Sequence, residues 1–127
     1  MRKEQITNLR PTIPKAELTE GISEIEKFQN TALRQIIKFQ HEVILLVFSS
    51  YARKIHKDWG SLSNEKKEAF IESVMSKNQQ LKNQYIGIIL GLLSEEEIEF
   101  YQNNSSEINR RITQIIKQRV QTNLGSI

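Results

Sequence analysis

The sequence predicts an all-α fold, an up-down-up bundle of three long helices at about 22–57, 64–90 and 95–123 with an N-terminal arm or short helix. Apolar residues recur at intervals of three and four over each range, which is the spacing of one helix face. Capping and turn residues stand between the ranges. The two connections, around 58–63 and 91–94, are short and therefore force antiparallel neighbours.

The 127 residues form a single domain by length. We divide them into an N-terminal segment, 1–21, and a helical bundle, 22–127. Residues 1–14 hold Pro11 and Pro14 among scattered apolar residues, which predicts an irregular surface arm rather than a helix. Residues 15–20 have room for one helical turn or two before Gly21.

The range 22–57 contains no proline or glycine and reads as one long helix. Between Val43 and Ala52 it is apolar nearly all round, which implies neighbours on more than one side. The helix is therefore expected to be central or to pack against a second chain. Trp59, just beyond its end, is expected to be buried. Its stripe is Leu33, Ile37, Ile44, Val47, Phe48, Tyr51 and Ile55.

The next two helices begin with clear capping signals. Serine and asparagine side chains with an acid, at 61–65, open the 64–90 helix. Ser94 with Glu97 three residues on forms a capping box for the 95–123 helix. The polar run 103–106 could break that last helix in two, but an unbroken apolar stripe favours one helix.

Four polar residues interrupt the stripes: Gln40, His41, Asn78 and Ser105. Folding straight helices about residues 60 and 92 places Gln80 opposite both His41 and Ser105, so the four are predicted to meet in one inward layer. An unpartnered buried polar group costs about 1–3 kcal/mol, so they are expected to bond to one another and fix the helix register. A small ligand-binding pocket, with His41 as its titratable member, is the alternative.

No catalytic residue, metal site or cofactor is expected. The absence of cysteine excludes disulfides and thiolate ligands. His41 and His56 lie about 22 Å apart along one helix and cannot share an ion. The repeated Glu-x-x-His pattern of di-iron bundles is absent.

Basic residues gather at the C-terminal end of the chain. The chain has 18 basic and 15 acidic residues, and four basic residues with no acid fall in 109–127: Arg110, Arg111, Lys117 and Arg119. They could touch nucleic acid or an acidic partner, but completing the polar face and dipole of the helix is the favoured interpretation. Arg119 lies on the apolar stripe, and we expect it to pair with an acid at the bundle end, with a partner-facing anchor as the rival. The candidate acids are Asp58, Glu65, Glu68 and Glu72.

The functional expectation is a non-enzymatic regulatory or adaptor protein that works through protein contacts, as a homodimer through the apolar surface of the 22–57 helix. A ligand-binding sensory bundle using the polar layer and a nucleic-acid-associated protein using the basic C-terminal helix stay as alternatives. The longest apolar stretch, 85–93, is too short to span a bilayer. The first residues hold no apolar core of the length that a secretory signal needs, so a cytoplasmic protein is expected.

Overall fold

The structure of the protein is a computed structural model that describes residues 1–11 and 23–127. All regular structure in these two ranges is helical, which confirms the all-α prediction. The helices are α1 (Arg2–Leu9), α2 (Glu24–Phe28), α3 (Arg34–Phe39), α4 (His41–Ile55), α5 (Asn64–Lys77), α6 (Gln79–Leu90), α7 (Glu95–Asn103) and α8 (Ser105–Gln121). A π-helical stretch, Gln29–Leu33, joins α2 to α3, and short 3₁₀ turns occupy Trp59–Ser61 and Leu124–Ser126.

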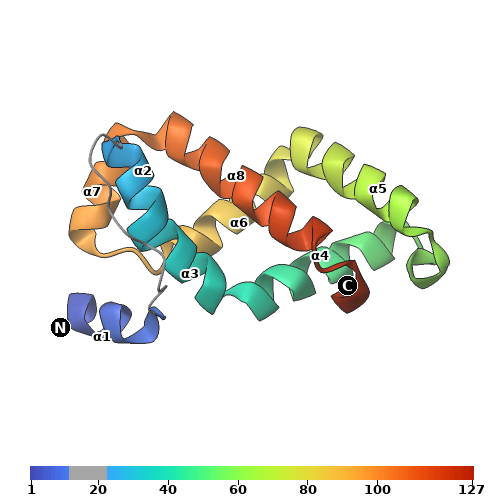
Figure 1. Ribbon diagram of the computed structural model, residues 1–127, viewed down its shortest axis with the longest axis horizontal. Helices are drawn as coiled ribbons and strands as arrows, with labels where there is room; N and C mark the ends of the chain where they lie inside the picture. Colours follow the sequence, from blue (N-terminus) through green and yellow to red (C-terminus); the bar gives the residue numbers. More distant parts are fainter. Residues whose placement is uncertain (12–22) are drawn as a thin grey trace.

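The molecule is elongated, and the chain runs along it three times (Figure 1). It crosses from one end to the other through α2, α3 and α4, returns through α5 and α6, and crosses again in α8. The C-terminus lies beside α4, and α1 lies near α7 at the end of the molecule away from the turn between α4 and α5.

The central element is α8. It packs against α4, α5, α6, α7 and the π-helical stretch. Its buried residues recur at every fourth position, and none has exposed surface: Ile108, Ile112, Ile116 and Val120. Side chains spaced by four form one continuous ridge on a helix, and that ridge is the middle of the core.

None of the three predicted long helices is continuous. Gln40 separates α3 from α4, Asn78 separates α5 from α6, and Asn104 separates α7 from α8. Each break falls at or beside a polar residue that interrupts an apolar stripe. The prediction of three unbroken helices is therefore wrong. At Asn78 and Asn104 the side chain bonds to a nearby backbone group and so competes with the helical hydrogen bonds.

The break at Gln40 is a bend rather than an end. Its backbone has φ −90° and ψ 11°, yet its N–H still donates to the Ile36 carbonyl at 2.9 Å and its carbonyl accepts from the Ile44 N–H at 2.9 Å. The side-chain amide donates to the Ile88 carbonyl at 3.4 Å and so ties the bend to α6.

The break at Asn78 is sharper, since its ψ of 91° takes the backbone out of the helical region. The side-chain oxygen accepts from the Leu81 N–H at 3.0 Å, which caps the start of α6. The side-chain nitrogen donates to the Tyr51 hydroxyl of α4 at 2.9 Å. One side chain therefore starts a helix and holds it to its neighbour.

Asn104 has φ −137° and ψ 27° and divides the last predicted helix. Its side chain donates to the Phe100 carbonyl at 2.9 Å, and the Tyr101 hydroxyl reaches across the break to Asn109 at 2.6 Å. The favoured interpretation of 103–106 as continuous helix is wrong. The polar run was the better signal, because the apolar spacing continues on both sides of the break.

The helix starts follow the predicted capping chemistry. Ser63 accepts from the Lys66 N–H at 3.2 Å at the start of α5. At α7 the capping box is complete, since Ser94 accepts from the Glu97 N–H at 3.3 Å and donates its own N–H to Glu97 at 2.9 Å. Trp59 is fully buried, as predicted.

Residues Arg2–Leu9 form a helix, which corrects the prediction of an irregular arm for the described part, 1–11, of residues 1–14. In α1, Ile6 is buried, and the helix ends at Leu9 because Arg10, before Pro11, takes an extended ψ of 122°. The prolines thus follow a helix rather than prevent one. The helical turn expected at 15–20 lies outside the described residues.

Ion pairs attach the N-terminal segment to the first turn of α7. Arg2 bonds to Glu95 at 2.9 Å, Lys3 to Glu96 at 3.3 Å, and Arg10 to Glu97 at 2.6 Å. The first two pairs are exposed, whereas the Arg10 side chain is only 9% exposed. Arg10 also donates to the Thr31 carbonyl and to Gln35, so it joins three segments at one point.

The Asn78 cap can be tested by Asn78→Ala. Loss of the cap and of the bond to Tyr51 should lower the free energy of unfolding by about 1–3 kcal/mol, measured by urea denaturation. The matched control is Asn83→Ala on the exposed surface of the same helix, expected to change stability by less than about 0.5 kcal/mol. Equal effects of the two substitutions would contradict the assigned cap.

The Arg10–Glu97 pair should make stability depend on pH. Burial alone would raise the pKa of Glu97, but hydrogen bonds from Arg10 and from the Ser94 amide hold it below its ordinary value of 4.5. A lowered carboxyl pKa stabilises the folded state above the unfolded pKa, and that contribution disappears as the pH falls through the folded pKa.

We therefore expect Glu97→Gln, which retains a capping side chain, to cost about 1–3 kcal/mol at neutral pH. The difference from the unmodified protein should shrink as the pH falls below 4.5. Urea denaturation at a series of pH values measures it. Glu96→Gln is the control, because an exposed pair is worth less than about 1 kcal/mol. A difference that does not change with pH would refute the assignment.

Candidate functional site

The four polar residues predicted to form one layer are spread over the molecule. Gln40 bonds to Ile88 near the end of α6, whereas Asn78 bonds to Tyr51 towards the other end of α4. At about 1.5 Å per residue, Gln40 and Tyr51 are about 16 Å apart along the helix. Gln40 and Asn78 therefore lie at different heights.

His41 and Ser105 are also separated. His41 Nδ1 lies 2.9 Å from an Nη atom of Arg119, close to the end of α8. Ser105 is the first residue of α8, which puts it about 21 Å along the axis from Arg119. The predicted single layer is thus wrong, and ligand binding by any one of the four residues stays a prediction.

The error came from the assumed register between helices. Three bonds define how α4 runs against α6: Gln40 to Ile88, Tyr85 to the Ile44 carbonyl, and Asn78 to Tyr51. They place His41 opposite residues near Ile88, about two helical turns beyond the predicted Gln80. The height calculation assumed straight helices folded about one turn, and the break at Asn78 invalidates that assumption.

Two of the four predicted basic residues, Arg110 and Arg111, share one carboxylate. Arg110 lies 2.6 Å and Arg111 2.9 Å from Glu107, and Arg111 also donates to Gln29 at 3.0 Å. Hydrogen bonds from the two arginines lower the pKa of Glu107 to about 2. The acid therefore stays ionised and offsets part of the positive charge at this end of α8.

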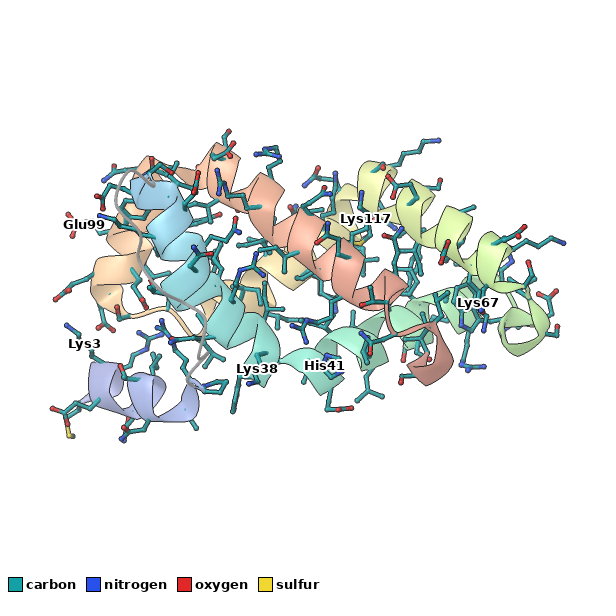
Figure 2. The ribbon with its side chains drawn as sticks, in the orientation of Figure 1. Lys3, Lys38, His41, Lys67, Glu99 and Lys117 are labelled. Carbon is teal, nitrogen blue, oxygen red and sulfur yellow. The ribbon has the colours of Figure 1, made fainter. Side chains whose placement is uncertain are left out.

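Lys117 pairs with Glu72 of α5 at 3.1 Å, and Gln121 donates to the same carboxylate at 3.3 Å. The hydrogen bond from Lys117, followed by that from Gln121, lowers the pKa of Glu72. Figure 2 shows Lys117 between α8 and α5, on the side of α8 away from Lys38. This lysine neutralises the acid that was a candidate partner for Arg119.

Arg119 itself forms no ion pair within the described residues, which corrects its predicted pairing with an acid at the bundle end. Its contact is with His41. Since arginine only donates hydrogen bonds, this contact is a hydrogen bond in the histidine tautomer whose Nδ1 is the acceptor. Burial first, and the positive charge of Arg34 second, lower the pKa of Arg119.

An exposed apolar surface was expected on the 22–57 helix, and in the structure it includes a row of residues on α3 and α4 that the sequence did not single out. Phe39 is 45%, Val43 41% and Leu46 66% exposed. Their spacing of four and three places them on one outer face, while the inner face of α4 is buried through Ile44, Leu45, Phe48 and Ala52. The signal was present, because this helix is apolar nearly all round in the sequence.

A shallow groove of 380 Å³ lies beside this row, between α4 and α6. Its lining combines apolar and polar side chains: Leu46, Val47, Ser50, Tyr51, Lys54, Leu81 and Gln84. The exposed row and the groove together define a surface that we call the α4 face.

Comparison with protein-family models, curated proteins and solved structures finds no match for this chain. Within the described residues, no three acidic or histidine side chains gather as a metal site would require. No helix in those same ranges has the length and apolar character needed to cross a membrane.

Arg111 pairs with an acid, whereas Arg119 pairs with none among the described residues, and two substitutions test this difference. Arg119→Met removes a half-buried charge that has no carboxylate partner among the described residues, and should leave the free energy of unfolding unchanged or raise it by less than about 1 kcal/mol. Arg111→Met breaks bonds to Glu107 and Gln29 and should lower it by about 0.5–1.5 kcal/mol. Urea denaturation at low salt measures both, and a larger loss for Arg119→Met would refute the assignment.

Proposed function

We propose that this protein is a non-enzymatic binding module that acts through protein contacts, and that the α4 face carries the contact. The supporting observation is the exposed row Phe39, Val43 and Leu46 on a helix whose opposite side is already buried in the core. Single exposed apolar residues are common on protein surfaces, but a continuous row beside a groove is typical of interfaces.

The free energy available at this face is substantial. Burying a large apolar side chain contributes about 1.5–3 kcal/mol, and Leu46 retains most of its accessible surface. The groove beside Leu46 offers space for a side chain of a partner. A partner that covers the row therefore gains burial that the chain's own core does not supply.

The partner favoured by the charges is a second copy of the chain. If two α4 helices pack antiparallel about a two-fold axis and cross near Val47, Glu42 of one copy lies opposite Arg53 of the other. Glu42 and Arg53 flank the same side of the apolar row, about three turns apart. Arg53 bonds only to Ser49 of its own helix in the described part of the chain, so its charge can serve the contact.

Three alternatives receive less support. A ligand pocket in the polar layer loses its basis, because the residues that would form it lie at different heights. Nucleic-acid binding by the last helix loses strength, because Arg110, Arg111 and Lys117 are paired with acids. Catalysis by His41 is disfavoured, because its Nδ1 faces Arg119 rather than a carboxylate.

Light scattering coupled to size exclusion tests the proposal. The unmodified protein should show the mass of a dimer, and Leu46→Glu should show that of a monomer with unchanged helix content by circular dichroism. The control Ser73→Glu, at an exposed position of α5, should remain dimeric. A monomeric unmodified protein, or a dimer that survives Leu46→Glu, would contradict self-association through this face.

The orientation is tested separately by a charge exchange. Glu42→Arg should weaken the dimer by placing like charges opposite each other, and Glu42→Arg combined with Arg53→Glu should restore it. Failure of the double variant to recover would exclude the antiparallel arrangement while leaving the α4 face itself as the contact.

A further inference from the structure

Three clefts adjoin one another along the line where α3 faces α8. Their volumes are 220, 330 and 300 Å³, and Arg34 and Ile115 line all three. The smallest is lined by Arg34, Ile37, Lys38, Ile115 and Arg119. Two isoleucines thus form its apolar walls, and three cationic side chains surround it.

The charges around this cleft differ from those elsewhere on α8. In the described ranges, no carboxylate lines the three clefts, and none of Arg34, Lys38 and Arg119 belongs to an ion pair. Arg110, Arg111 and Lys117, by contrast, all contact acids. Positive charges therefore gather at the clefts between α3 and α8, and no acidic side chain among the described residues neutralises them there.

Most N–H groups of the Arg34 and Arg119 side chains are also available to bind a ligand. Arg34 uses Nε for Asn30, at 3.4 Å, and Arg119 uses one Nη for His41, at 2.9 Å. The other N–H groups of both guanidinium groups have no partner among the described residues. Figure 2 shows Lys38 and His41 at the bend between α3 and α4, below α8, so the bend at Gln40 brings them towards the end of that helix.

Like charges held together beside apolar walls repel each other more strongly than they would in water. The pKa of Arg119, lowered by burial and by Arg34, is consistent with this repulsion. An anion in the cleft would convert the repulsion into attraction. Planar guanidinium groups favour oxyanions, to which they donate two parallel hydrogen bonds.

We propose that the cleft between α3 and α8 binds a phosphoryl dianion, either free phosphate or the terminal group of a small phosphorylated molecule, through Arg34, Lys38 and Arg119. Two negative charges match three surrounding cations better than a single carboxylate does. The volume of 220 Å³ suits a small group rather than a polymer, and Ile37 and Ile115 can contact an apolar part attached to the phosphate. This site is independent of the α4 face.

Isothermal titration calorimetry with inorganic phosphate and with phenyl phosphate, in chloride buffer of constant ionic strength, tests the site. Both probes should bind the unmodified protein saturably at one site. Arg119→Gln and Arg34→Gln should each weaken binding about tenfold or more, which corresponds to losing one charge-assisted contact. Tighter binding of phenyl phosphate identifies a small phosphorylated molecule as the ligand class, and equal binding identifies free phosphate.

Matched controls separate this site from general attraction by positive charge. Arg110→Gln and Lys117→Gln remove the same charge from α8 outside the smallest cleft and should change affinity less than about twofold. If Arg119→Gln does not fold, as judged by circular dichroism, Lys38→Gln at an exposed position replaces it. Absence of saturable binding, or equal weakening by the controls, overturns the proposal. Leu46→Glu should leave phosphate binding intact, so failure of the dimer and failure of this site are distinguishable.

Discussion

The burial of one ridge on α8 determines the arrangement of the rest of the chain. Ile108, Ile112, Ile116 and Val120 are completely covered, and covering a straight ridge of this length requires neighbours along the whole helix. Helices α4, α5, α6 and α7 share that role. The breaks at Gln40, Asn78 and Asn104 divide these neighbours into short helices, and α4, α5, α6 and α7 each contact α8. The outer face of α4 stays uncovered because α8 occupies only its inner side.

The same helix separates two electrostatic environments. Lys117 and Arg119 are two positions apart and therefore point to opposite flanks of α8. The Lys117 flank faces α5 and contacts Glu72, whereas the Arg119 flank faces the bend at Gln40 and contacts His41. The basic residues near the C-terminus are thus divided between two sides of α8: Lys117 is paired with an acid on one side, and Arg119 contacts a histidine on the other. Only the flank towards α3 keeps positive charge uncompensated among the described residues.

Local chemistry was predictable from the sequence, and long-range geometry was not. The capping box of Ser94 and Glu97 was correctly identified. Capping side chains were expected within 61–65, and Ser63 of that range is the cap. The breaks at Gln40 and Asn78 were missed, and the break at 103–106 was considered but not favoured, because apolar spacing continues across all three positions. The pattern alone cannot distinguish a bent helix from a straight one. Because the break at Asn78 changes the register of α6 against α4, His41 lies opposite residues near Ile88 and not opposite Gln80 as predicted. The helix α1 was missed because proline content was weighed over a whole segment, although both prolines follow its last turn.

The three ion pairs between the N-terminal segment and α7 differ in exposure, and this difference affects how readily each part of the segment detaches from α7. Arg2 and Lys3 hold exposed carboxylates, while Arg10 is enclosed at the far end of the same helix. Amide hydrogens at the start of α1 should therefore exchange with solvent readily, and more so in salt, without detachment of Arg10. We expect the protection of these amides from exchange to rise along the chain from Arg2 towards Arg10, because only the Arg10 pair is enclosed.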